Sequence, residues 1–248
     1  KMLLQLYPDP AGGIDAVYYR MALSYEKLNF YYEAAAAWER LILTYPASAF
    51  LPEAMFRVGD ILRQTGKYNR AVERLSAYLK KYPDGKYAKI SYFVMGDCYY
   101  RMRKGDLAGK WYDEARKKWP ELYDIPKAIF INMGAHYFEV GRFNEAFHVF
   151  SGYVSLYPAD EFSKTAYYKM ARACEEAGQA LLALKLYSLF IGKYPTGRES
   201  EECALAMATL GVSKPGIKFP ANILPNINDY LEPLQTYDRI LAKNPEDE

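Results

Sequence analysis

The side chains that most often do chemistry are few and scattered in this sequence. The two histidines are His136 and His148, and the three cysteines are Cys98, Cys174 and Cys203. Neither set has the short paired spacing of a zinc site or a disulfide framework. We therefore expect the cysteines to be core thiols, His136 to be partly buried with its hydrogen bonds satisfied, and His148 to face outward.

One pair of carboxylates could suggest acid–base catalysis. Asp60 and Asp97 occupy equivalent positions in a repeated pattern described below, and they flank Arg57 and Arg101. Salt bridges explain such a cluster without any reaction. No phosphate-binding glycine loop and no nucleophile–base motif occurs. The sequence therefore favours a non-catalytic protein that needs no cofactor.

Composition excludes several other classes of protein. The chain has 248 residues, 51% hydrophobic and 25% charged, which is typical of a folded domain and not of a disordered tail. A net charge of +2 is too small to favour a nucleic-acid partner. No apolar run reaches the roughly 20 residues of a membrane span. The chain begins at Lys1 instead of Met, so we expect a piece of a longer protein.

An aromatic residue followed by proline recurs along the chain. Successive prolines are 37 or 38 residues apart, and a fixed period of this kind indicates a repeat architecture. The pairs are Tyr7-Pro8, Tyr45-Pro46, Tyr82-Pro83, Trp119-Pro120, Tyr157-Pro158 and Tyr194-Pro195.

Each period also carries small and large residues at fixed positions. A small residue stands 24 before the proline, an alanine stands 12 before it, and a large residue stands 8 before it. Small residues let two helices cross closely, and large residues spaced by three or four form one helix face. The small residues are Ala22, Gly59, Gly96, Gly134 and Ala171, and the large ones are Trp38, Leu75, Tyr112, Phe150 and Tyr187.

The turn between the two helices of a period is predicted from its glycines. Gly66, Gly141 and Gly178 supply the left-handed residue that ends a first helix. Asn69 and Asn144 are predicted N-caps of the second helix. The third period has Arg103 in place of glycine, so its turn is predicted to be shifted. The proline ends the second helix.

This pattern resembles the tetratricopeptide repeat. The resemblance covers five whole repeats in residues 15–199 and implies an all-α, right-handed solenoid of antiparallel helix pairs with a period of about 37 residues. Residues 1–14 are interpreted as the tail of a truncated preceding repeat. Residues 200–248 are interpreted as a divergent sixth repeat with a Pro/Gly-rich insert at 212–226. This insert is either a docking loop or a tolerated bulge.

The additional residues in each period have a pattern of their own. An aromatic residue follows the proline by four positions at Phe50, Tyr87 and Phe162, and by three at Tyr123. This long-period form resembles a tetratricopeptide subgroup found in bacterial envelope proteins, namely an outer-membrane assembly lipoprotein and a periplasmic cell-division coordinator. That resemblance implies the periplasm, or the periplasmic face of the outer membrane with indirect association to it; a cytoplasmic location stays open.

The resemblance also implies a protein or peptide partner bound on the concave face, which the first helices line. The apolar middle, Phe93, Tyr100, Ile131 and Phe138, with basic rims would suit an amphipathic helix or an extended acidic peptide. Core packing stays the alternative for these side chains and for Tyr19 and Phe56. The candidate contact residues are Tyr19, Phe56, Arg57, Arg63, Phe93, Tyr100, Arg101, Ile131, Phe138, Tyr168 and Arg172.

The sequence therefore predicts a binding scaffold for envelope assembly or secretion, without nucleic acid, metal or cofactor. Two other functions stay open. Superhelices lined by aromatic residues can bind glycans such as peptidoglycan, and the segment could instead be a spacer or regulatory arm of a larger enzyme.

Overall fold

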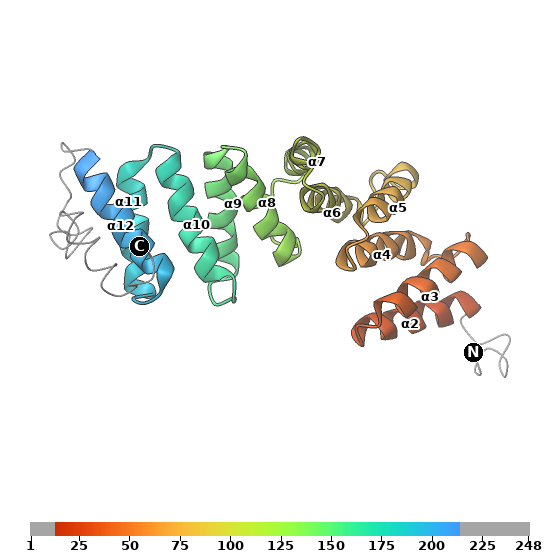
Figure 1. Ribbon diagram of the computed structural model, residues 1–248. Helices are drawn as coiled ribbons and strands as arrows, with labels where there is room; N and C mark the ends of the chain where they lie inside the picture. The colour runs from red at the N-terminus through yellow and green to blue at the C-terminus, as the bar shows by residue number, and fades with distance from the viewer. Residues whose placement is uncertain (1–12, 214–248) are drawn as a thin grey trace. The chain divides into compact units, whose positions relative to one another are not determined.

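The computed structural model describes residues 13–213, which are helices joined by short turns and loops with no strand in that range. These residues divide into two compact units, one ending at Ile125 and the other beginning at Pro126. Figure 1 shows the helices of both in chain order. Most of the predicted tail at 1–14 lies outside the described residues. The same is true of residues 214–248, which include nearly all of the insert at 212–226.

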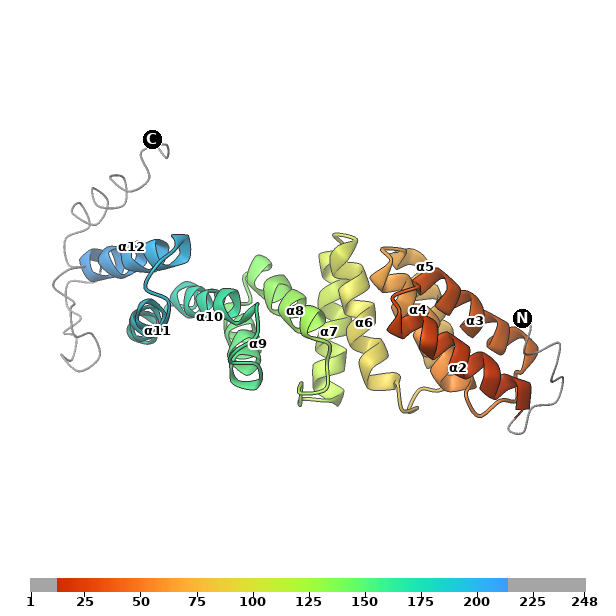
Figure 2. The same cartoon turned by 90° about the horizontal axis from the view of Figure 1, so that it is seen from below.

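The first unit consists of three antiparallel helix pairs, in which each helix contacts the next along the chain (Figure 2). The loops between pairs contain the aromatic–proline motif. The helices are α2 (Gly13–Lys27), α3 (Tyr31–Thr44), α4 (Leu51–Gln64), α5 (Tyr68–Lys81), α6 (Ala88–Arg101) and α7 (Gly105–Lys118).

The second unit repeats this arrangement with two helix pairs, followed by α12, which packs on α11. The antiparallel helix pairs expected from the period are thus confirmed. The helices are α8 (Lys127–Glu139), α9 (Phe143–Leu156), α10 (Ser163–Glu176), α11 (Ala180–Lys193) and α12 (Arg198–Ser213).

The core of each pair is a small residue of the first helix facing a large residue of the second. The large residues Trp38, Leu75, Tyr112, Phe150 and Tyr187 are all fully buried. A Cβ atom added at Gly59 would lie 2.6 Å from Cγ of Leu75, and one added at Gly96 would lie 2.6 Å from the ring of Tyr112. The two helices cross at a distance that leaves no room for a methyl group at these glycines.

The turn inside a pair is a Schellman motif. At the end of α4, Gly66 has φ +76°, its N–H donates to the Arg63 carbonyl (3.0 Å), and the Lys67 N–H donates to the Leu62 carbonyl (2.8 Å). This pattern satisfies carbonyl groups that the helix end would otherwise leave unpaired. The prediction that glycine takes the left-handed conformation here is confirmed, and it also holds at Gly141 and Gly178.

The prediction that Asn69 and Asn144 are N-caps is wrong. The cap residues are Lys67 and Arg142, and neither helix has a side-chain cap hydrogen bond. Because the residue that closes the Schellman motif also begins the next helix, the turn is shorter than the cap prediction assumed. Both asparagines therefore lie inside the first turn of the second helix.

The predicted shift of the third turn is also wrong. Arg103 itself adopts the left-handed conformation, with φ 59°, and the Lys104 N–H donates to the Tyr99 carbonyl at 2.9 Å. The motif is therefore the same as in the other pairs. A residue other than glycine in this conformation lowers the stability of the fold by about 1 kcal/mol. The backbone hydrogen bonds that close the turn between α6 and α7 offset this cost.

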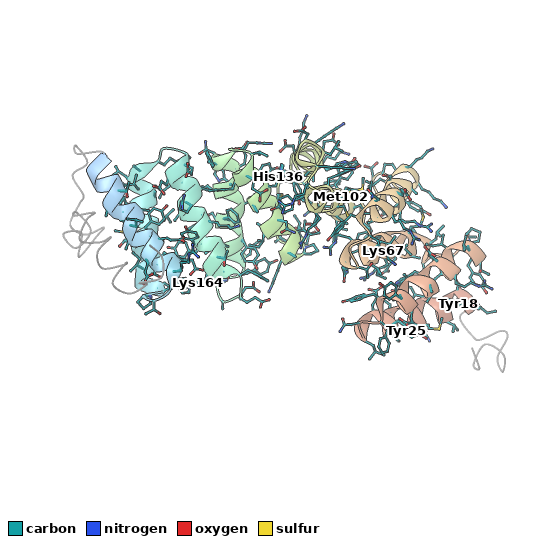
Figure 3. The ribbon with its side chains drawn as sticks, in the orientation of Figure 1. Tyr18, Tyr25, Lys67, Met102, His136 and Lys164 are labelled. Atoms are coloured by element: carbon teal, nitrogen blue, oxygen red, sulfur yellow. The ribbon has the colours of Figure 1, made fainter. Side chains whose placement is uncertain are left out.

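Consecutive pairs are linked by polar contacts between residues about one period apart. A lysine near the start of a first helix donates to a carboxylate near the start of the next period, as at Lys164 in α10 (Figure 3). The links are Lys89 Nζ to Asp124 (2.5 Å), Lys127 Nζ to Asp160 (2.5 Å) and Lys164 Nζ to Glu199 (3.0 Å).

The close approach at Gly96 predicts a stability effect. Gly96→Ala should lower the free energy of unfolding by about 1–3 kcal/mol, because the new methyl group would overlap the rigid, buried ring of Tyr112. Urea unfolding followed by circular dichroism measures this change. Gly192→Ala in α11 is the control, since a Cβ there meets nothing within 4 Å, and it should be neutral or stabilising by up to about 1 kcal/mol. Equal stability of the two variants would contradict the packing described.

The link at Asp160 predicts a pH dependence. The hydrogen bond from Lys127, with a second from the Tyr153 hydroxyl (2.5 Å), lowers the pKa of Asp160 to about 2. Because the folded pKa lies below the unfolded value of about 3.9, this contribution to stability is present above pH ~4 and is lost as the pH falls toward 2. NMR titration of the carboxyl carbon should show the low midpoint in the wild type. This midpoint pH should rise in Lys127→Met. It should not change in Lys185→Met, which replaces an exposed lysine of α11.

Candidate functional site

The first arginine of the predicted rim is held between two carboxylates. Arg57 lies 3.2 Å from Glu26 and 3.2 Å from Glu53. Glu26 also accepts a hydrogen bond from Trp38 Nε1 at 2.5 Å. Burial raises the pKa of Glu26, although Trp38 and Arg57 act in the opposite direction. The group ties α2, α3 and α4 together.

Arg63, in the last turn of α4, has the same role. Its guanidinium lies 2.9 Å from Asp60 and 3.1 Å from Asp97, and Asp97 is fully buried. Burial would lower the pKa of Arg63, but the two aspartates outweigh that effect and raise it. Asp60 and Asp97 therefore have the salt-bridge role that the sequence predicted.

In the second unit Arg172 is surrounded by acceptors. It lies 3.4 Å from Glu175 and 3.4 Å from Glu176, and it donates to the Tyr168 hydroxyl at 3.2 Å. That hydroxyl in turn donates to Glu202. Burial, followed by the bond to Glu202, raises the pKa of Tyr168 to about 12, so the hydroxyl stays protonated at neutral pH.

The predicted basic rims are therefore largely neutralised within the protein. Arg57, Arg63 and Arg172 each pair with at least two carboxylates. Arg101, at the end of α6, is exposed. An acidic partner would thus have to compete with existing ion pairs at three of the four arginines.

Two of the predicted apolar contact residues lie inside the first unit. Phe93 has no exposed surface and Phe56 is 3% exposed. The Tyr87 ring stacks on Phe56, with centroids 4.9 Å apart and planes 7° apart. In the preceding pair, the Phe50 ring stacks on Tyr19 at 4.2 Å. These rings are covered by aromatic side chains of their own unit.

The remaining apolar candidates are partly accessible. Tyr19 and Tyr100 are half-buried on first helices of the first unit. Ile131, Phe138 and Tyr168 are half-buried on first helices of the second. Tyr19 also donates to Glu53 at 3.3 Å. Each unit therefore presents its own set of side chains, in which a large ring is accessible on one side and held by packing on the other.

Phe50 and Tyr87 are the residues whose role sequence reasoning missed. Their spacing after the proline was visible, but it indicated only a subgroup. In the structure each lies at the N-cap of a first helix and covers the ring of the preceding first helix. Tyr87 is also fixed by its N–H, which donates to the Tyr78 hydroxyl at 3.0 Å.

The thiols are core residues and His148 faces outward, both as expected, whereas His136 is more fully buried than expected. Cys98, Cys174 and Cys203 are buried, and burial raises their pKa values to about 12, 11 and 12. Thiols with such values are poor nucleophiles at neutral pH. His136 is 3% exposed, and His148 is exposed. Within residues 13–213 no three His, Cys, Asp or Glu side chains are grouped as metal ligands.

A pocket of 610 Å³ lies against α2 and α3, and two of its lining rings, Tyr18 and Tyr25, come from α2 (Figure 3). Met21 also lines it and is half-buried, whereas the equivalent residues Val58 and Met95 are buried where a preceding second helix packs on α4 and α6. The pocket thus coincides with the surface on which one pair stacks against the next.

The fold and these contacts define an α-helical repeat protein without an evident reaction centre in its described residues. A tetratricopeptide repeat model matches residues 19–86 and 56–122. No curated protein shows significant similarity to the sequence. In residues 13–213 no helix has the length and apolar character needed to cross a bilayer.

Several solved structures share the fold of this chain. The C-terminal part of a TPR repeat-containing protein from Cytophaga hutchinsonii is 18% identical, with a TM-score of 0.62, covering 100% of this chain and 90% of that one. A MamA protein is 16% identical, with a TM-score of 0.55, covering 83% and 97%. MamA of AMB-1 is 24% identical, with a TM-score of 0.51, covering 70% and 94%. These likenesses show the fold, which is a tetratricopeptide solenoid.

The position of Arg63 predicts a large loss of stability when it is removed. Arg63→Met leaves the buried Asp97 without its arginine countercharge and should lower the free energy of unfolding by about 3–5 kcal/mol. Arg74→Met is the matched control, because the Arg74–Glu39 pair (2.8 Å) is largely exposed and should contribute less than about 1 kcal/mol. Urea unfolding compares the two, and similar losses would rule out the structural role of Arg63.

Proposed function

We propose that the chain is a non-catalytic scaffold that binds a segment of a partner protein on its first helices. The observation that carries this proposal is a set of half-buried rings on first helices. Tyr100 and Phe138 stand at equivalent positions, and Tyr168 lies two helical turns nearer the start of its first helix. A ring that is packed on one side and accessible on the other offers apolar contact area with little entropy to lose on binding. Tetratricopeptide scaffolds are generally non-catalytic, in keeping with this proposal.

The pairing of the arginines refines the chemistry of the partner. Because Arg57, Arg63 and Arg172 are already bound to carboxylates, attraction between charges is weak on this surface. Apolar side chains of the partner would therefore supply most of the affinity. An amphipathic helix, with apolar residues spaced to meet successive first helices of one unit, fits better than an extended acidic peptide.

We place this role in the bacterial envelope, in the periplasm or at the periplasmic face of the outer membrane, in assembly or secretion. Support comes from the 37-residue period and from the aromatic residues that follow each proline, which resemble the envelope subgroup. The described fold is equally compatible with the cytoplasm, so the compartment of the captured partner is included in the test.

One observation favours a second candidate, the binding of a glycan such as peptidoglycan. Carbohydrate sites combine aromatic rings with neighbouring carboxylates, and two accessible tyrosines have such neighbours. Tyr19 donates to Glu53, and Tyr168 donates to Glu202. Both carboxylates are already engaged by these hydroxyls, which leaves less capacity for a sugar and ranks this candidate second.

A crosslinking pull-down from the native host tests the scaffold proposal. The chain would be compared with Tyr100→Ala/Phe138→Ala, which removes one half-buried ring from a first helix of each unit. The control is Tyr32→Ala/His148→Ala, which removes one exposed ring from a second helix of each unit. A defined protein should be captured by wild type and control and lost by the test variant, with all three equally helical.

Capture of the same protein by the test variant would refute binding at these first helices. Retention of the chain on purified peptidoglycan sacculi, with loss in Tyr168→Ala, would favour the glycan candidate instead. A captured protein with a cytoplasmic location would overturn the envelope component of the proposal and leave the scaffold component intact.

A further inference from the structure

Two second helices of the first unit, α5 and α7, end in an unusual concentration of lysine. The last turn of α5 contains Lys80 and Lys81, and the last turn of α7 contains Arg116, Lys117 and Lys118. Cations at a helix C-terminus offset the helix dipole, but that requirement is common to every helix. The last turns of α3 and α9 have no basic residue. The dipole alone therefore does not explain why the lysines gather at these two ends.

These helix ends and the loop between them lie on one edge of the first unit. Lys118 Nζ, at the end of α7, donates to the Tyr92 hydroxyl in α6 at 2.9 Å. After that bond, Asp84 in the loop between α5 and α6 is among the charges that raise the pKa of Lys118. The loop also contributes Lys86. We define the basic edge as Lys80, Lys81, Lys86, Lys117 and Lys118, all of which are exposed.

Aromatic rings hold three of these lysines in place. The Nζ atom of Lys81 lies 5.5 Å from the Tyr82 ring centroid, and that of Lys86 lies 5.3 Å from Tyr87. Lys118 Nζ lies 4.5 Å from the Tyr92 ring. Such contacts orient an ammonium group, but a ring carries no net charge and does not neutralise it. The basic edge differs in this respect from Arg57 and Arg63, whose charges are cancelled by carboxylates.

The concentration of charge is clear in the sequence of this region. Between Lys67 and Lys118 there are 14 basic and 6 acidic residues, although the whole chain has a net charge of only +2. From these observations we propose that the basic edge is a second interaction surface, separate from the first-helix rings, that binds an acidic peptide segment of a partner protein. The preoriented ammonium groups would each meet a carboxylate of that segment.

A peptide fits this edge better than a membrane or a nucleic acid. Between Leu43 and Tyr123 the one large exposed apolar side chain among the described residues is Leu107. It lies in the first turn of α7, at the opposite end of that helix from the basic edge, so the edge itself has no such side chain to insert into lipid. Asp84 interrupts the lysines close to Lys118. A peptide can place uncharged residues beside Asp84, whereas the evenly spaced phosphates of a nucleic acid cannot avoid it.

The test uses a fluorescein-labelled peptide of alternating Glu and Ser and measures fluorescence anisotropy at low salt. Wild type should bind, and binding should weaken as salt rises. Lys80→Glu/Lys117→Glu should lower the affinity roughly ten-fold or more. The control is Arg70→Glu/Lys110→Glu, which makes the same change of charge at exposed positions of the same two helices, away from their C-terminal ends. Its affinity should stay within about two-fold of wild type, as expected when the lost charges lie outside the contact.

Three results would overturn the proposal. They are no binding by wild type at low salt, equal losses in both variants, and tighter binding of single-stranded DNA or of vesicles with anionic lipid than of the peptide at the same salt concentration. Circular dichroism and thermal unfolding of both variants confirm that the fold is retained. If Lys80→Glu/Lys117→Glu loses the peptide but still captures the partner protein that Tyr100→Ala/Phe138→Ala loses, the two surfaces bind independently.

Discussion

The contact between a small residue of one helix and a large residue of its partner sets the geometry on which the rest of the protein depends. At Gly59 and Gly96 the partner side chain comes so close that a methyl group would overlap it. The same position on the second helix also supplies a polar link. Trp38 donates to Glu26, and Tyr187 donates to Glu175. One side chain thus sets the crossing distance and orients a carboxylate on the first helix, and that carboxylate then holds an arginine.

In the described residues, basic side chains are neutralised by carboxylates on one surface and keep their charge on another. On the first helices, arginines are surrounded by carboxylates, so the surface there is close to neutral and its accessible features are rings such as Tyr100 and Phe138. At the ends of α5 and α7, lysines lie over rings and keep their charge. The two surfaces therefore suit partner segments of different chemistry, one apolar and one acidic.

The period in the sequence was enough to predict the helix pairs, the glycine turns and the buried faces, because these depend on residue size and spacing alone. It did not predict that Arg103 would take a conformation typical of glycine, since the turn is maintained by backbone hydrogen bonds that a side chain does not reveal. Less of the candidate site could be predicted from the sequence. Whether Arg63 is paired depends on carboxylates of two helices, and whether Phe56 is exposed depends on Tyr87 in a loop.

The links between neighbouring pairs have a consequence for how such a chain can change over generations. Lys127 reaches Asp160 and Lys164 reaches Glu199, so each donor finds its acceptor about one period further along. A duplication or excision of one whole period preserves this spacing, so a lysine and a carboxylate at the new junction stay in register wherever the joined periods carry them. A gain or loss of a few residues inside a helix would instead misalign all the bonds of that junction at once. Recombination in whole periods is therefore the route by which this array can lengthen or shorten and still fold.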